Sequence, residues 1–134
     1  MASPQTKVLD VHSHAMPLPL LTWLAGRGLA DVAIEQDIVR LDPRISGVGP
    51  GAPLPLAPSQ YRVQERLPEM EAAGVSHHAV SMPPFLFCST ADDGQFVTEI
   101  IRRGNDELAA YVAEGPDHLV ALGSVPIGLS LIHI

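Results

Sequence analysis

The chain of 134 residues has a single cysteine, Cys88. One thiol excludes an intramolecular disulfide framework and a thiolate-rich zinc site, so a metal would have to be held by histidine and carboxylate side chains. A lone thiol is also typical of a reducing compartment. Residues 1–7 are too short and too polar to be read as a signal peptide. No apolar run approaches the roughly 20 residues of a membrane helix. These absences predict a soluble, cytoplasmic protein.

Basic side chains are also scarce. Lys and Arg number 8 against 15 Asp and Glu, which gives a net charge of -7. Such a balance argues against a non-specific surface for nucleic acid or for an anionic membrane, because both require excess positive charge. Hydrophobic residues make up 46% of the chain, enough for one modest domain with a buried core. We therefore expect small molecules as partners.

A short apolar stretch, residues 8–14, ends in two histidines separated by one residue. Side chains on a strand alternate between its faces, so His12 and His14 are predicted on one side and Ser13 on the other. Neutral imidazole is a favoured ligand of zinc and related divalent metals. The pattern predicts half of a metal site. Because His-x-His alone is a weak motif, two ordinary polar residues at a strand end remain the alternative.

The rest of the chain predicts a succession of βα units. Gly26 and Gly28 end a short helix, and a small hairpin at 29–40 is favoured over a broken helix. A Pro- and Gly-rich loop at 42–58 either covers the site or connects elements in solvent. The remaining expected elements are a helix over 59–73 with Ser59 as N-cap and a kink at Pro68, a buried strand at 75–82, a helix from 92 or 93 to 114, and a strand at 119–126.

Right-handed crossovers would make the three main strands, including the first, one parallel sheet. Parallel sheets are covered on both faces, and two crossovers leave much of the surface bare. The chain is therefore predicted to be the first part of something larger. Adjacent His77 and His78 face opposite ways and are expected to be structural or exposed, while His118 is expected in a solvated loop before its strand.

Four stretches carry a family likeness: VHSH at 11–14 with Pro17, EMEAAGV at 69–75, VSMPP at 80–84, and NDELA at 105–109 running into VALGSVP at 120–126. Together, and in this order, they resemble the amidohydrolase-related family. The nearest branch contains aminocarboxymuconate-semialdehyde decarboxylase and related nonoxidative decarboxylases. The resemblance spans nearly the whole chain.

The resemblance implies a metal-dependent (β/α)8 TIM barrel, which takes roughly 250 residues. Residues 1–128 would form its N-terminal portion, with about three parallel strands and their crossover helices. His12 and His14 match the family's first-strand metal ligands, so the implied cofactor is a divalent metal, zinc in our expectation. The other ligands and the catalytic aspartate would lie beyond this chain, and we expect the isolated chain to be inactive.

The implied reaction is nonoxidative decarboxylation of a small acidic unsaturated or aromatic substrate. Arginine suits a substrate carboxylate through its planar fork, and Arg44, ahead of Arg40, is the candidate. Hydrolysis of an ester, lactone or amide on the same fold is one alternative. A non-catalytic metal-binding or interaction domain is another, and it would need its apolar faces covered, for example by dimerisation through strand edges. Whether the full-length protein forms a homodimer is left undecided by the sequence.

The last six residues, LSLIHI at 129–134, resemble the translation of a transposase adapter used in sequencing libraries. We interpret them as an artefactual tail on a truncated reading frame. A natural apolar end is the alternative. On the first interpretation, His133 is not counted as a metal ligand.

Overall fold

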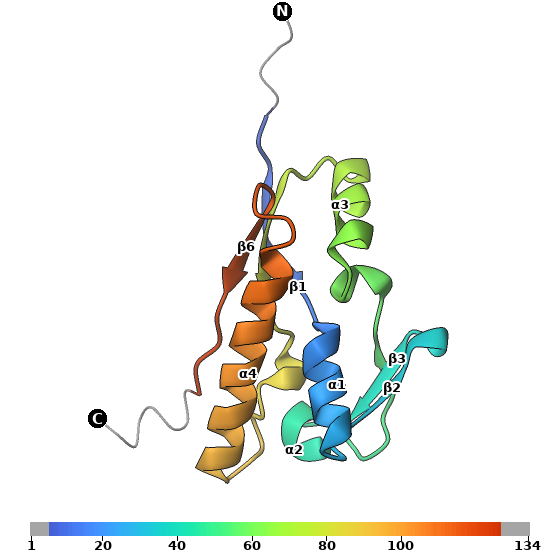
Figure 1. Ribbon diagram of the computed structural model, residues 1–134, viewed down its shortest axis with the longest axis vertical. Helices are drawn as coiled ribbons and strands as arrows, with labels where there is room; N and C mark the ends of the chain where they lie inside the picture. The colour runs from blue at the N-terminus through green and yellow to red at the C-terminus, as the bar shows by residue number, and fades with distance from the viewer. Residues whose placement is uncertain (1–5, 127–134) are drawn as a thin grey trace, which may run out of the picture.

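A parallel sheet of three strands organises the protein (Figure 1). The computed structural model describes residues 6–126. Strand β5 (His77–Ser81) lies between β1 (Leu9–His14) and β6 (Leu119–Leu122), and both pairings are parallel. The predicted α/β order and the parallel sheet are therefore confirmed. Since parallel strands end at one edge of a sheet, His14 and Ser81 come together there.

Helices α3 (Val63–Ala72) and α4 (Gly94–Val112) form the two crossovers. The carboxylate of Asp93 caps α4 by accepting hydrogen bonds from the backbone N–H groups of Gln95 and Phe96 at 3.0 and 3.2 Å. The helix buries a stripe of side chains at helical spacing, namely Val97, Ile100, Ile101, Gly104, Leu108 and Tyr111. The helix predicted from 92 or 93 to 114 is confirmed.

The predicted N-cap of α3 is wrong. Ser59 lies in a separate 3₁₀ turn, Pro58–Gln60, which is closed by the Gln60 side chain accepting from the Ala57 N–H at 2.7 Å. The chain then extends before α3 begins at Val63. Pro68 lies inside α3, as expected.

An excursion separates β1 from α3. It holds α1 (Leu18–Gly26) and an antiparallel sheet in which β2 (Ala30–Ala33) pairs with β3 (Ile38–Leu41), and β3 pairs with β4 (Leu54–Pro55). The favoured hairpin is confirmed. A 3₁₀ turn, Ile34–Gln36, joins its strands.

The stretch predicted as a plain loop at 42–58 contains β4 and a short helix, α2 (Pro43–Ser46), and that expectation is corrected. Asp42 accepts a hydrogen bond from the Arg44 N–H at 2.9 Å, Pro43 occupies the first turn, and Gly47 ends the helix at φ 74°. Aspartate before proline is a helix-start signal, and here it outweighs the local abundance of glycine and proline.

The excursion packs beyond the carboxyl end of the parallel sheet, in the lower part of Figure 1. The N–H of Met16, two residues after β1, donates to the Gln60 carbonyl at 2.8 Å. The N–H of Cys88, after β5, donates to the Ile45 carbonyl at 3.0 Å. These bonds anchor the excursion next to the ends of β1 and β5.

The two faces of the parallel sheet differ. Val80 and Leu119, on the face that packs against α3 and α4, are 0% and 4% exposed. Other apolar strand residues are exposed, namely Leu9, Val11, Val120 and Leu122 at 57%, 68%, 55% and 44%. No element among residues 6–126 covers these side chains. The expectation of bare sheet surface is confirmed.

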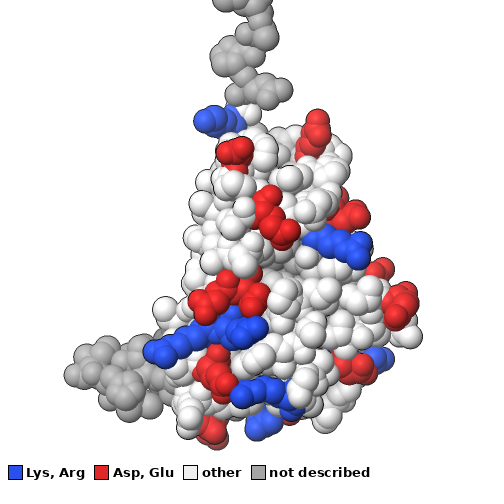
Figure 2. Space-filling model, in the orientation of Figure 1, with Lys and Arg blue, Asp and Glu red and all other residues white. Residues whose placement is uncertain are grey.

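Charges on the molecular surface are mixed. On the face drawn in Figure 2, acidic and basic side chains are interspersed among uncharged ones. Within residues 6–126, no helix combines the length and the apolar character needed to cross a membrane. The proposed tail at 129–134 and His133 lie outside the described residues.

Candidate metal centre

Strand β1 carries an irregularity next to its histidines. Asp10 lies opposite His78 and Ser13 opposite Val80, so three steps along β1 match two along β5, which is the pattern of a β-bulge. The bulge places Asp10 and Ser13 on the same face, although simple alternation would place Asp10 with the histidines. The Asp10 carboxylate accepts from the His12 N–H at 2.9 Å.

The side chains of His12 and His14 lie together. Their ring centroids are 4.9 Å apart and the ring planes make an angle of 72°. Zinc–nitrogen bonds are about 2.0–2.1 Å long, so two imidazoles on one tetrahedral zinc have centroids roughly 5 Å apart. The spacing and the donor type therefore fit a divalent metal bound between the rings.

His14 is held at its ring and at its backbone. Ring Nδ1 lies 3.1 Å from the hydroxyl of Ser81, the residue opposite it on β5. The carbonyl oxygen of His14 accepts a hydrogen bond from Nη2 of Arg66 on α3. The next N–H, that of Ala15, donates to the Ser81 carbonyl at 3.0 Å. These contacts fix the carboxyl end of β1 against its neighbours.

Arg66 is 5% exposed and lies behind the histidine strand, on the helix-covered side. Its Nη1 donates to Ser13 Oγ at 2.5 Å and to His78 Nδ1 at 2.9 Å. Its Nε lies 2.7 Å from the Tyr111 hydroxyl and 3.2 Å from the Ser59 carbonyl. Among residues 6–126, no carboxylate forms an ion pair with this guanidinium.

Sequence reasoning missed Arg66. A signal was present: Val63, Arg66 and Met70 have the spacing of one helix face, and all three are buried. An arginine on an otherwise apolar helix face indicates a buried polar network. What it binds depends on β1, β5 and α4, which are distant in the sequence.

Burial lowers the pKa of His78 below its ordinary value, and the positive charge of Arg66 lowers it further. Asp10 acts in the opposite direction from 3.9 Å. Because Arg66 donates to Nδ1, the neutral ring with its proton on Nε2 is favoured. His78 is thus a structural acceptor, and the expectation that it faces away from its neighbour His77 agrees with the strand register.

His77 and His118 form a separate pair near the amino end of β5. Their centroids are 6.1 Å apart, and their Nδ1 atoms lie against the hydroxyl and the carbonyl of Ser76 at 2.8 and 3.0 Å. Within residues 6–126, no group of three or more His, Cys, Asp or Glu side chains is placed to hold a metal. In this part of the chain, the pair of His12 and His14 therefore has no third protein ligand.

The chain was compared with known proteins. No protein-family model matches it. A curated 2-amino-3-carboxymuconate-6-semialdehyde decarboxylase from Caenorhabditis elegans is 29% identical over 132 residues, covering 94% of this chain and 31% of the relative. The chain is a distant homologue of this decarboxylase. The resemblance predicted from the motifs is thus confirmed, and the chain spans about a third of the relative's length.

Arg44, the candidate for substrate binding in this decarboxylase homologue, already has partners. Its guanidinium donates to both carboxylate oxygens of Asp42 at 3.1 Å, and its Cζ lies 4.6 Å from the ring centre of Phe96. The hydrogen bond from Arg44 lowers the pKa of the Asp42 carboxyl. A substrate carboxylate would compete with Asp42, and the substrate role of Arg44 stays a prediction. Nε of Arg40 donates to the Gly51 carbonyl at 3.2 Å.

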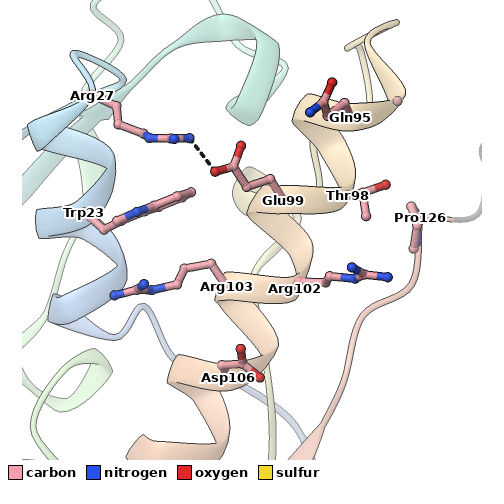
Figure 3. A pocket seen from close by; sticks show the side chains of 10 residues that line it. Trp23, Arg27, Gln95, Thr98, Glu99, Arg102, Arg103, Asp106 and Pro126 are labelled. Carbon is pink, nitrogen blue, oxygen red and sulfur yellow. Dashed lines mark ion pairs between the residues drawn. The ribbon is translucent and has the colours of Figure 1, made fainter.

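A hollow lies between α1 and α4 (Figure 3). Trp23 lies between two guanidinium groups, with the Cζ atoms of Arg27 and Arg103 at 4.6 and 5.4 Å from its ring. Arg27 pairs with Glu99 at 2.8 Å. The side chains that line this hollow do not include the site histidines.

Cys88 is buried, and burial raises the pKa of its thiol to about 11. The thiol is therefore protonated at neutral pH and is not a nucleophile.

We predict that Arg66→Ala lowers the free energy of unfolding by about 3 kcal/mol or more. The substitution leaves several buried acceptors without a donor, each costing roughly 1–3 kcal/mol. Arg62→Ala is the matched control, since Arg62 is an exposed arginine of the same segment, and its effect should stay within about 0.5 kcal/mol. Urea unfolding measures both. Equal effects would contradict the assigned role of Arg66.

We predict that part of the stability is lost below pH 6.5 through His78. Its folded-state pKa lies below the unfolded value of about 6.5, so the unfolded state binds more protons in this range. Stability is complete above the unfolded pKa and falls as the pH drops towards the folded pKa. His78→Asn, which keeps an acceptor for Arg66, should flatten this slope, and His118→Asn should retain it. Urea unfolding at a series of pH values measures the slope, and an unchanged slope in His78→Asn would refute the assignment.

Proposed function

We propose that residues 1–128 are the N-terminal portion of a metal-dependent (β/α)8 barrel that decarboxylates a small acidic unsaturated or aromatic substrate without an oxidant. The observation that carries this proposal is the pair of imidazoles 4.9 Å apart at the carboxyl end of β1. Active sites of such barrels lie at the carboxyl ends of the strands. The relative is a decarboxylase, which supports decarboxylation ahead of hydrolysis.

The uneven burial of the sheet supports the barrel. Leu9, Val120 and Leu122 are large apolar residues that a stable isolated sheet would cover. In a barrel, inward-pointing strand residues pack against those of the other strands, and bulky aliphatic residues dominate there. A chain that spans about a third of its relative holds only part of such an interior. We infer that further strands cover this surface in the full-length protein.

In this proposal, His12 and His14 supply two neutral imidazole nitrogens to a divalent metal, zinc in our expectation. The bound metal supplies Lewis acidity and a water whose pKa is lowered towards about 7. The residues of this chain bind and orient: the strand presents both rings on one side, and Arg66 fixes the backbone behind them. The remaining ligands and the catalytic aspartate are assigned to segments outside this chain. Arg44 would bind a substrate carboxylate through its planar fork.

Replacing both His12 and His14 with Ala should weaken Zn²⁺ binding by more than about 100-fold. Removing only the hydrogen-bond partner of a metal ligand typically costs 10–100-fold in metal affinity, and removing the ligands themselves should cost more. Competition of the chain with a chromophoric chelator measures the affinity. The matched control replaces His77 and His118 with Ala, which removes the other close histidine pair. Unchanged binding in the first variant, or equal loss in both, would refute the ligand assignment.

The reaction itself is tested on a protein extended beyond residue 128 to the length of the relative. Loaded with Zn²⁺, it should release CO₂ from carboxylated unsaturated or aromatic substrates, measured by a coupled CO₂ assay. The 134-residue chain serves as the control, and we expect it to be inactive. Turnover of carboxylate-free esters or lactones without CO₂ release would favour the hydrolase alternative. Metal binding without any turnover would favour a binding domain.

A further inference from the structure

We infer that Ser81 is a positioning residue that holds His14 in the tautomer with its proton on Nδ1, leaving the Nε2 lone pair free for a metal. The metal part of this inference rests on the proposed function. The tautomer itself is a property of the chain without metal. Neither the sequence motifs nor the comparison assigns a role to Ser81.

The hydrogen bonds around Ser81 determine the direction of the contact. Its hydroxyl has one proton to donate, and it lies 3.4 Å from the carbonyl oxygen of Ser13 and 3.1 Å from Nδ1 of His14. A carbonyl oxygen can only accept, so both contacts are hydrogen bonds only if the hydroxyl donates to Ser13 and accepts from Nδ1 of His14. The arrangement that satisfies both contacts therefore has Nδ1 of His14 as a donor. In neutral imidazole only one nitrogen carries a proton, so Nε2 is left unprotonated.

The opposite direction would oppose metal binding at Nε2. If the Ser81 hydroxyl donated to Nδ1, the proton of the neutral ring would lie on Nε2, and the ring would have to change tautomer before that nitrogen could bind a metal. Metal-bound histidines almost always donate their second ring N–H to an oxygen acceptor, which fixes both tautomer and orientation. A serine hydroxyl that is itself turned towards a carbonyl provides such an acceptor.

The backbone keeps the Ser81 oxygen in place. Ser81 and His14 are opposite each other in the parallel pairing, and the Ala15 N–H bonds to the Ser81 carbonyl at 3.0 Å. Arg66 holds the carbonyl of His14 from the other side. The described part of the chain offers no hydrogen-bond partner to the ring of His12. The two ligands are therefore unequal: His14 is fixed before the metal binds, and His12 can adjust to it.

Long-range ¹H–¹⁵N spectra of the metal-free chain at about pH 8.5, some two units above the ordinary histidine pKa, report each tautomer directly. We expect the Nδ1–H form for His14 in the wild type and in Ser81→Thr, which keeps the hydroxyl. In Ser81→Ala, the ring should shift towards the Nε2–H form that a free histidine favours in water. Ser76→Ala is the matched control, since Ser76 contacts Nδ1 of His77 at 2.8 Å and should leave His14 unchanged.

A wild-type His14 in the Nε2–H form would overturn the inference, as would a tautomer that does not respond to Ser81→Ala. If Ser81→Ala does not fold, the wild type and Ser81→Thr decide, and loss of the Nδ1–H form in the threonine variant would count against us. In the chelator competition, Ser81→Ala should weaken Zn²⁺ binding 10–100-fold while Ser76→Ala does not. A wild-type chain with the Nδ1–H form and no affinity for Zn²⁺ would refute the proposed function but support the assigned tautomer.

Discussion

The guanidinium of Arg66 connects the segments that shape the histidine strand. It bonds to Ser13 and His14 on β1, to His78 on β5 and, through Tyr111, to α4. Taking a cation out of water costs several kcal/mol, and hydrogen bonds from a charged donor return roughly 1.5–3 kcal/mol each. Arg66 meets this cost with neutral acceptors, since no carboxylate among residues 6–126 pairs with it.

The same network separates two chemical environments across one strand. On the helix side, burial and Arg66 keep His78 neutral, and burial raises the pKa of Tyr111 so that its hydroxyl stays protonated and donates to Ser59 at 2.6 Å. On the other side, His12 and His14 lie together at the end of the strand. A single bulge in β1 turns Asp10 towards the first environment. The metal ligands we propose thus lie on a strand that is fixed from behind.

Local patterns predicted the parallel strands, the long helix and the shared side of His12 and His14, because alternation and helical spacing are properties of a few neighbouring residues. The bulge at Asp10 and the contacts of Arg66 depend on strands and helices far apart in the sequence. The helix start at Asp42 and Pro43 is also a local signal, but the many glycines and prolines around it lead to the prediction of a loop instead. The exposure of Leu9 is expected because two crossovers leave much of a three-stranded sheet bare. The segment around Leu9 is apolar and by itself predicts a buried strand.

The central claim is that His12 and His14 bind a divalent metal, and the position of a bound metal ion tests it directly. Crystals of the chain soaked in Zn²⁺ and measured at the zinc absorption edge locate the ion without reference to activity. We predict an anomalous peak about 2.0–2.1 Å from a ring nitrogen of both His12 and His14. A peak between His77 and His118 with none at His12 and His14, or no peak on any histidine, would contradict this account.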